Sequence, residues 1–519
     1  MTISSSRRGF LRGLAGLTAI GAGGCFSIGR KSGKIRLAAV GINGKGYSDW
    51  LPMLQSGLVE IVAFCDADAN QLKNVLPRAA KDAPGHDLSK VPFYTDYRKL
   101  LDDAGMLGIE AMTISTPDHV HAPIAIRAMK MGIHVYVQKP LVRTLWELDY
   151  FNKTARDNGV IVQMGNQGSA LDSMRRCTEI LQSGVLGDVK EVHVWTNRPV
   201  WPQGKVLSDY IKSRGDKGDA IPAGLDWNAF LGTAKDRPYL GKFPDNLGPF
   251  HNDWKIAPNV YHAFNWRGSI DFGAGAFGDM ACHTMNLPFR GLELANVTDA
   301  ECTMIDGKSD LIYPVKSIVK LTYAERVARY GANKGAKLPA VTLFWYDGDE
   351  KPSASIMPKY AAKNGGKVPN TGCYIIGSKG AVLMQDDYGA KCAIALNDDK
   401  EFSDVFAHPA AKEVGMWIPK ISQVAAFAGG SSVAMTGFAN EHYIEFLTAI
   451  RGEGIVYEQT HSRCFSDVEY CIPQMEGILV GCIAQQVAGK HTWDSASQKF
   501  GDAAANALVK PYIRKGFEF

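Results

Sequence analysis

The sequence predicts an α/β protein in which a doubly wound parallel sheet is followed by a second, α+β domain. Two observations support this. Short apolar runs rich in β-branched residues alternate with amphipathic stretches over residues 34–166, and the alternation changes from residue 167 onward. With 519 residues the chain is too long for one ordinary domain. We therefore expect a leader over residues 1–33, a nucleotide-type domain over 34–166 and a second domain over 167–519.

The leader has the form of an export signal. Arg7 and Arg8 precede an apolar, glycine-rich run over residues 13–24 that is too short to be a good spanning helix. The paired arginines, with Phe and Leu after them, resemble the twin-arginine motif, which implies export of the folded protein to the periplasm. A disordered basic tail is the alternative. Cys25 stands near a position for a lipid anchor, but the leucine expected three residues earlier is missing, so anchoring stays open.

The body of the chain is electrically neutral. Formal net charge is +4, and residues 1–30 hold four arginines and no acid, so the remainder sums to zero. Neutrality gives no electrostatic reason to expect nucleic acid or an acidic membrane as partner, and we expect no membrane span. The ten cysteines form no C-x-x-C pair and no clustered histidine joins them, so we expect no metal site.

Six apolar runs in the first domain have the pattern of strands buried on both faces of a parallel sheet. Each is bounded by turn residues. Helical periodicity separates them, most clearly over residues 120–131 and 145–158. The expected strands are residues 35–42, 60–65, 92–95, 111–115, 134–137 and 160–164.

A glycine-rich turn follows the first expected strand. Glycine lets the backbone turn sharply and approach a pyrophosphate, whose charge the next helix N-terminus favours. Asp66, 20 residues beyond the last of these glycines, is suited to bind the adenosine ribose hydroxyls and to repel a 2′-phosphate. This predicts a Rossmann domain that prefers NAD to NADP, and an ordinary tight turn is the alternative. The turn consists of Gly41, Ile42, Asn43, Gly44, Lys45 and Gly46.

Three further motifs follow in order along the chain. They are Ser115-Thr116-Pro117-Asp118-His119-Val120-His121, Gln138-Lys139-Pro140 and Gly278-Asp279-Met280-Ala281-Cys282-His283. With the glycine turn, they resemble the Gfo/Idh/MocA oxidoreductases, named for glucose–fructose oxidoreductase and inositol dehydrogenase. The resemblance implies a second domain with an open, mostly antiparallel sheet, through which copies often associate. It also implies a cofactor pocket that includes Ser115, Thr116, Pro117, His119, His121 and Gln138.

The same resemblance assigns Lys139, Asp279 and His283 as the catalytic group. Oxidation of an alcohol requires the hydroxyl proton to leave as hydride moves to NAD, and a histidine is suited to accept it. Asp279 precedes His283 by four residues, so on a helix both face one ligand. A lysine beside the reacting carbon stabilises alkoxide charge. The alternatives are a solvated loop lysine, a helix cap and a core histidine. Gln138 stands where the family commonly has Glu, which leaves the orientation of the lysine open.

Two aromatic segments of the second domain, residues 195–204 and 265–268, predict a sugar pocket. Tryptophan faces bury the C–H faces of sugars, while amide and guanidinium groups reach hydroxyls. Packing as core filler is the alternative. Strands are expected over residues 189–196, 317–322, 341–346 and 381–383, with helices over 174–183, 441–454 and 472–489. The expected substrate-binding residues are Trp195, Asn197, Arg198, Trp201, Trp266 and Arg267.

Together these features predict an exported oxidoreductase that acts on a sugar or glycoside. Since little free nicotinamide exists outside the cytoplasm, we expect a tightly held NAD that the enzyme recycles itself. Redox-neutral cleavage of a glycoside by oxidation, elimination and reduction is one alternative. A sugar-binding protein that has lost its chemistry is another.

Overall fold

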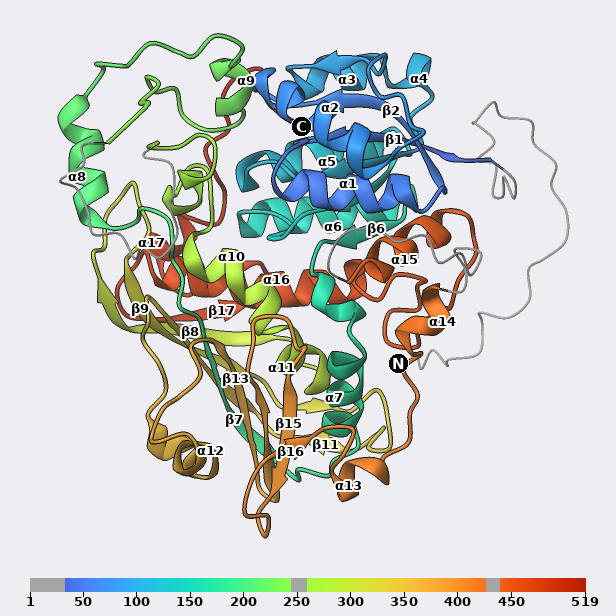
Figure 1. Cartoon of the computed structure of the whole chain (residues 1–519). Helices are drawn as coiled ribbons and strands as arrows, with labels where there is room; N and C mark the ends of the chain where they lie inside the picture. The colour runs from blue at the N-terminus through green and yellow to red at the C-terminus, as the bar shows by residue number, and fades with distance from the viewer. Residues whose placement is uncertain (1–32, 244–258, 426–438) are drawn as a thin grey trace, which may run out of the picture.

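A computed structural model describes residues 33–243, 259–425 and 439–519. The expected export signal, with Arg7, Arg8 and Cys25, lies outside these residues. Figure 1 shows the N-terminal layer of helices and strands above a larger, strongly twisted sheet, with helix α16 (Val468–Ala484) running between them. No helix in the described ranges combines the length and hydropathy needed to cross a bilayer.

The N-terminal sheet is parallel throughout, in the order β3-β2-β1-β4-β5-β6, which confirms the predicted doubly wound fold. In β1, Leu37 and Ala39 enter one hydrophobic core while Ala38 and Val40 enter another, because successive side chains point to opposite faces. The strands are β1 (Ile35–Val40), β2 (Val59–Cys65), β3 (Phe93–Tyr94), β4 (Ala111–Ile114), β5 (His134–Val137) and β6 (Val162–Met164). The helices are α1 (Lys45–Gln55), α2 (Asn70–Asp82), α3 (Tyr97–Asp102), α4 (Ala104–Leu107), α5 (His121–Lys130) and α6 (Leu145–Asn158).

Local sequence signals explain where these elements begin and end. The expected first strand stops two residues early, at Val40, because Gly41 adopts a φ of +76° and turns the chain. Helix α6 begins at a capping box in which the side chains of Thr144 and Glu147 accept each other's backbone N–H, and it ends at Gly159, with a φ of +59°.

The second sheet has ten strands in the order β16-β15-β14-β13-β7-β12-β9-β8-β17-β18. It is mostly antiparallel, as expected, and β7 and β12 form its parallel pair. The strands are β7 (Val189–Trp195), β8 (Val297–Asp306), β9 (Lys316–Tyr323), β12 (Val341–Asp347), β13 (Gly372–Gly377), β14 (Gly380–Met384), β15 (Cys392–Leu396), β16 (Ser403–Asp404), β17 (Lys490–Asp494) and β18 (Lys499–Phe500). A separate ribbon pairs β10 (Arg326–Val327) with β11 (Lys337–Leu338).

Helices cover one face of this sheet and join it to the first domain. Helix α16 packs on β8 and β9 and also touches α6, whereas α15 contacts α1. The first of the two expected C-terminal helices thus closes onto the N-terminal domain, and the second covers the sheet. The remaining helices are α7 (Asp172–Gln182), α8 (Lys205–Arg214), α9 (Trp227–Leu231), α10 (Gly275–Thr284), α11 (Asn286–Gly291), α12 (Pro358–Lys363), α13 (Pro409–Lys412), α14 (Ile421–Ala425), α15 (Glu441–Ile450) and α17 (Ala503–Asn506).

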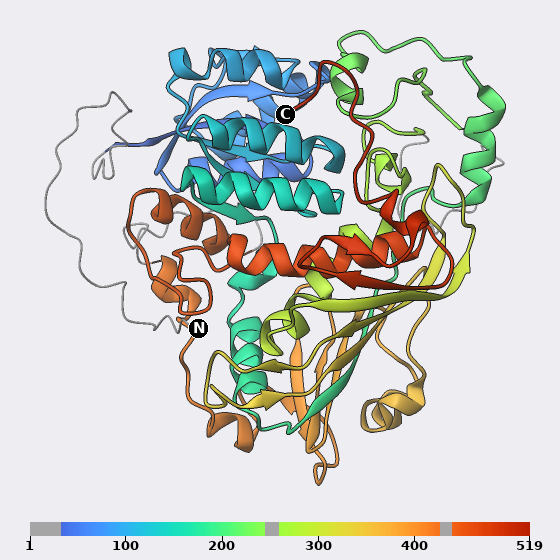
Figure 2. The ribbon, with the colours of Figure 1, turned by 180° about the vertical axis from the view of Figure 1, so that it is seen from behind.

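Two segments of the second domain return to the N-terminal domain. The segment that carries α8 and α9 extends beside it, and the tail after α17 runs back up to it (Figure 2). In the tail, the guanidinium of Arg98 lies 3.9 Å from the ring centroid of Phe517, and Arg514 donates to the carbonyl of Gly232 near α9. The tail therefore links residues 228–236, which include the end of α9, to the first domain. We call residues 228–236 the α9 segment.

Candidate active site

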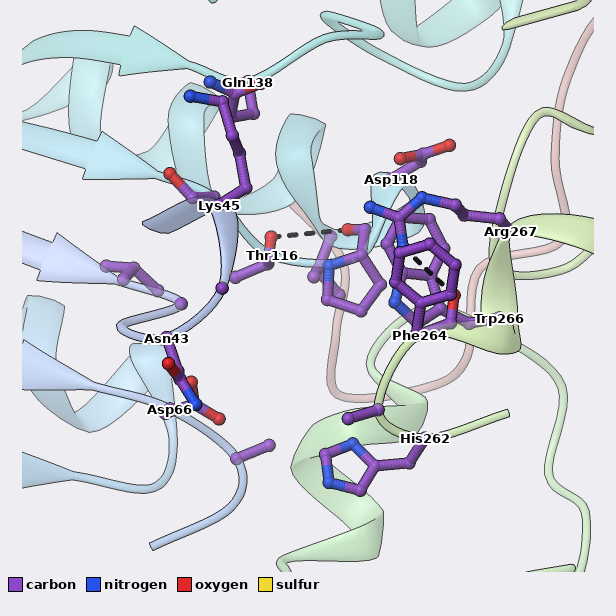
Figure 3. Close-up of a pocket in the computed structure, with 18 of the residues that line it drawn as sticks. Asn43, Lys45, Asp66, Thr116, Asp118, Gln138, His262, Phe264, Trp266 and Arg267 are labelled. Atoms are coloured by element: carbon purple, nitrogen blue, oxygen red, sulfur yellow. Dashed lines mark hydrogen bonds between the residues drawn. The ribbon is translucent and has the colours of Figure 1, made fainter. Parts of the chain in front are cut away.

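A cavity of about 600 Å³ lies at the carboxyl ends of β1, β2, β4 and β5, where doubly wound sheets bind ligands. Helix α10 and the α9 segment form its other walls. Figure 3 shows the glycine turn and Asp66 on one side of the cavity and the aromatic segment around Arg267 on the other. The cavity thus brings together residues from both halves of the chain.

The glycine turn fits a dinucleotide phosphate. A Cβ atom at Gly41 would lie 2.5 Å from the carbonyl oxygen of Ser115, and one at Gly46 would lie 1.7 Å from that of Gly41, so neither position accepts a side chain. Gly44, with a φ of +56°, faces open space at the start of α1. Asn43 and Lys45 also line the cavity. A helix N-terminus beside a bare backbone is the arrangement that binds pyrophosphate.

Asp66 lies at the end of β2, where the adenosine ribose of a dinucleotide would bind. Its carboxylate accepts hydrogen bonds from the backbone N–H groups of Ile42 and Asp68, at 3.1 Å each. Burial raises the pKa of Asp66 to about 6, against the opposing effect of these two donors. The group is therefore mostly ionised at pH 7, as repulsion of a 2′-phosphate requires.

Gln138 belongs to a hydrogen-bond network centred on a buried carboxylate. Its amide nitrogen donates to both oxygens of Asp49, at 3.1 and 3.0 Å. The same carboxylate accepts from Ser115 at 2.7 Å and from Tyr443 at 2.9 Å, and pairs with Lys45 at 2.6 Å. Gln138 is itself an amide, but the carboxylate of Asp49 lies directly beside it. Sequence reasoning had not singled out Asp49.

The two histidines of the S-T-P-D-H-V-H motif lie behind the cavity wall. Thr116 and Pro117 line the cavity, whereas His119 and His121 do not. His119 Nε2 bonds to the carbonyl of Phe230 at 2.9 Å, and both ring nitrogens of His121 bond to backbone carbonyls. Burial lowers the pKa of His119 to about 3 and that of His121 to about 4. Both rings are neutral at pH 7 and hold the wall in place.

Lys139 and Asp279 form an ion pair on the cavity wall. The Nζ of Lys139 lies 2.8 Å from Oδ1 of Asp279 and also donates to its backbone carbonyl at 3.0 Å. Arg267 Nε donates to the same oxygen at 3.3 Å. Despite burial, these two cations lower the pKa of Asp279 to about 2. One carboxylate therefore orients the lysine at the end of β5 and the arginine of the second domain.

His283 follows one helical turn after Asp279 on α10, and both residues line the cavity. Its ring stands edge-on to Tyr388, with centroids 4.7 Å apart, and Nδ1 has no hydrogen-bond partner among the described residues. Burial and the charge of Lys139 hold the pKa of His283 well below its usual value, although Asp279 opposes them. The imidazole is neutral and able to accept a proton.

The expected substrate residues divide into two groups. Arg198, Trp201, Trp266 and Arg267 line the cavity. Trp195 does not: it points to the face of the sheet opposite Val194, where its Nε1 donates to the carbonyl of Pro369. Asn197 is also absent from the cavity wall, and its side chain bonds to Arg198 instead.

Several lining residues were not expected from the sequence. Asp118 is buried beside Arg267. It belongs to the S-T-P-D-H-V-H motif, but the sequence alone assigns it no role. His262 reaches the end of β2 and pairs with Asp68 at 3.0 Å. Phe264 and Tyr388 carried no sequence signal, because only the tertiary fold brings their segments to the cavity. The described residues contain no cluster of three metal-ligating side chains.

Comparison with known proteins finds a family model that is similar to the N-terminal domain. Residues 35–166 match the Gfo/Idh/MocA model, described as "Oxidoreductase family, NAD-binding Rossmann fold". Glycosyl hydrolase family 109 protein 2 of Akkermansia muciniphila is 32% identical over 164 residues, which are 30% of this chain and 33% of that protein. Inositol 2-dehydrogenase of Salmonella paratyphi B is 27% identical over 161 residues, 31% of this chain and 44% of the relative. The chain thus matches less than half the length of either relative.

The fold of the whole chain is similar to that of solved dehydrogenases. An inositol dehydrogenase homolog from Azotobacter vinelandii, complexed with NADH and myo-inositol, aligns with a TM-score of 0.53 and 16% identity. The alignment covers 89% of this chain and 98% of that structure. The two-domain architecture is therefore shared.

Proposed function

We propose that this chain is an exported, NAD-dependent oxidoreductase of the Gfo/Idh/MocA type that acts on a sugar or glycoside, and the match of residues 35–166 to that family supports the proposal. One observation carries the proposal. Lys139, Asp279 and His283 line the same cavity as the glycine turn and Asp66, although they come from opposite halves of the chain. Acid–base groups next to a dinucleotide cradle are what alcohol oxidation requires.

The roles of the three residues follow from their charge states. Neutral His283 accepts the proton of the substrate hydroxyl. Lys139, fixed by Asp279 at 2.8 Å, stabilises the negative charge that develops on that oxygen. Bound NAD would accept hydride from the alcohol carbon and return it in the reverse direction. The indole rings of Trp201 and Trp266 provide apolar surface for a sugar ring, and the named substrates of relatives, such as inositol, support that substrate class.

Export and tight cofactor retention belong together in this proposal. The twin-arginine-like leader supports export in the folded state, and a periplasmic enzyme with a dissociable NAD would stop after one turnover. Ala229, Phe230 and His262, which follow the Rossmann domain in the chain, line the same cavity as Asp66. A cavity lined by both domains favours slow release of the cofactor.

Redox-neutral cleavage of a glycoside is the second candidate, and the resemblance to glycosyl hydrolase family 109 proteins favours it specifically. In that reaction a ring hydroxyl would be oxidised to a ketone by hydride transfer to NAD, and removal of the acidified neighbouring C–H proton would eliminate the aglycone. Water would then add across the resulting double bond, and hydride would return to the ketone. Net cofactor reduction would then be zero.

Native mass spectrometry of the folded protein as purified tests the proposal. We expect a mass increment equal to one NAD per chain. A protein that carries no nicotinamide and also fails to bind added NAD would contradict the proposal and favour a sugar-binding role. Release of phenol from an aryl glycoside without added NAD would favour cleavage, whereas a stoichiometric NADH signal would favour simple dehydrogenation.

A further inference from the structure

The substrate end of the cavity carries more positive than negative side chains. Lys139, Arg198 and Arg267 line it, and the carboxylates among the described lining residues there are Asp118 and Asp279. Asp66, the other lining acid, lies at the glycine-turn end (Figure 3). Arg198 pairs with Asp387, a residue outside the cavity lining, at 3.7 Å. Lys139 and Arg267 are therefore the cations that depend on Asp118 and Asp279 for compensation.

Asp118 and Asp279 do not fully compensate Lys139 and Arg267. Asp279 uses one oxygen, Oδ1, to pair with both Lys139 and Arg267, at 2.8 and 3.3 Å. Asp118 is 2% exposed, and its Oδ2 has no hydrogen-bond partner among the described residues. Burial, with the charge of Asp279, raises the pKa of Asp118 to about 8, so this acid is mostly neutral at pH 7. A buried site with surplus positive charge is costly unless an anion completes it.

Arg267 is held rigidly with donors to spare. Its guanidinium lies 4.2 Å from the ring centroid of Phe264 and 4.4 Å from that of Trp266. Nε bonds to Asp279, and Nη1 donates to the carbonyl of Phe264 at 3.0 Å. Nη2 makes no hydrogen bond within the described ranges, although the residue lines the cavity. A planar guanidinium fixed between aromatic rings matches a carboxylate better than it matches a hydroxyl.

We propose that the sugar bound here carries a carboxylate, as a uronic acid does, and that Arg267 binds that carboxylate. The inference rests on the proposed function and adds the chemical class of the substrate. His283 and Lys139 then remain available for the hydroxyl that is oxidised. A neutral sugar would leave the spare donors of Arg267 in contact with a ring that cannot neutralise its charge.

Matched pairs of sugars test the inference on the holoprotein. Calorimetry measures the affinities for glucuronate and glucose, galacturonate and galactose, and mannuronate and mannose, and absorbance at 340 nm measures reduction of the bound cofactor. We expect at least one uronate to bind at least tenfold more tightly than its neutral partner. Glucose 6-phosphate serves as the third arm, because equal or tighter binding of this phosphate ester would overturn the assignment to a carboxylate.

Two variants assign the effect to the residue. Arg267→Gln is expected to weaken uronate binding by about 30-fold more than it weakens binding of the neutral partner. Arg267→Lys keeps the charge without the planar fork and is expected to fall between the two. Arg156→Gln, on the exposed face of α6, is the matched control and should change neither affinity.

Failure of this inference is distinguishable from failure of the proposed function. If neutral sugars reduce the bound cofactor and uronates bind no better, the oxidoreductase assignment stands and the carboxylate assignment falls. The carboxylate assignment also falls if no uronate binds, or if Arg267→Gln weakens both members of a pair equally in a variant that retains the circular dichroism spectrum of the wild type.

Discussion

Asp118 illustrates how burial sets the protonation of a single side chain in this site. Its carboxyl group is enclosed beside Asp279, whose charge disfavours ionisation, while Arg267, Lys139 and Arg143 act in the opposite direction. The outcome is a pKa of about 8, far above the ordinary value for an aspartate. The unfolded chain therefore releases this proton at a much lower pH than the folded chain does.

The stability of the protein should consequently depend on pH through this residue. Between pH 4 and pH 8 the folded state binds more protons at Asp118 than the unfolded state, so this contribution to the free energy of unfolding falls as pH rises. Asp118→Asn replaces the carboxyl group with an amide that does not ionise, so it removes the free-energy cost of burying the aspartate at high pH. We expect the variant to exceed the wild type in the free energy of unfolding by roughly 3 kcal/mol at pH 8 and to differ little at pH 4.5. Urea titrations at the two pH values measure this, and equal differences at both would contradict it.

The assigned catalytic group makes a second prediction at this scale. Lys139→Met removes the charge that stabilises the developing alkoxide, and His283→Ala removes the proton acceptor. Each is expected to lower kcat by 10²- to 10⁴-fold, as loss of an acid–base or electrostatic group usually does. Lys153→Met, on the surface of α6, is the control for the loss of a lysine. Turnover that is unaltered in both site variants would refute the enzyme assignment.

Among the elements, those governed by local signals could be predicted from the sequence. The strands from β1 to β6 are apolar, short and bounded by turn residues, and α6 carries its capping box and terminal glycine. For α10, the spacing of Asp279 and His283 predicts only that the two residues share a face if the segment is helical. Their grouping with Lys139 is implied by the family resemblance rather than by periodicity, and the structure adds the contact between Lys139 and Asp279.

Elements that depend on distant pairing could not be predicted. The parallel pairing of β7 with β12 joins segments about 150 residues apart, and it decides which face of the sheet Trp195 occupies. The pair between His262 and Asp68 likewise joins residues 194 positions apart. No short-range sequence pattern indicates such contacts. The sequence therefore predicts that the two aromatic segments line the pocket, but it does not tell which of their side chains face it.

The C-terminal tail is the element whose contacts make the clearest prediction. Arg514 is buried and donates to the carbonyls of Gly232 and Asn228, at 3.0 and 2.6 Å, and pairs with Asp236 at 2.7 Å. Arg514→Ala should loosen the α9 segment, lower the free energy of unfolding by about 2 kcal/mol and speed loss of bound NAD. Gel filtration followed by assay of the released cofactor measures the loss. Lys515→Ala, at the exposed neighbour, should retain NAD like the wild type.

At the scale of the whole molecule, the face of the ten-stranded sheet away from α16 is the surface on which we expect two copies to associate. Along β9, Ile318 and Lys320 are only partly buried on this face, next to Phe344 of β12. A sheet face of this mixed character is suited to a partner surface.

Mass photometry of the wild type should therefore detect an oligomer. Phe344→Glu is expected to shift it toward monomer, because a charge at the centre of an apolar contact must be desolvated on association. Val327→Glu, which adds the same charge at an exposed position of the β10–β11 ribbon, should leave the oligomer intact. A monomeric wild type would refute this expectation.

The tail contact also has a consequence for biosynthesis. Arg514 is separated by 282 residues from Gly232, whose carbonyl it binds, so a ribosome must add nearly all of the second domain before this bond can form. Until then the stretch around α9, which contributes Ala229 and Phe230 to the cavity wall, lacks its bonds to the tail. We therefore expect this wall of the cavity to reach its final arrangement only late in synthesis, after the rest of the cavity has formed.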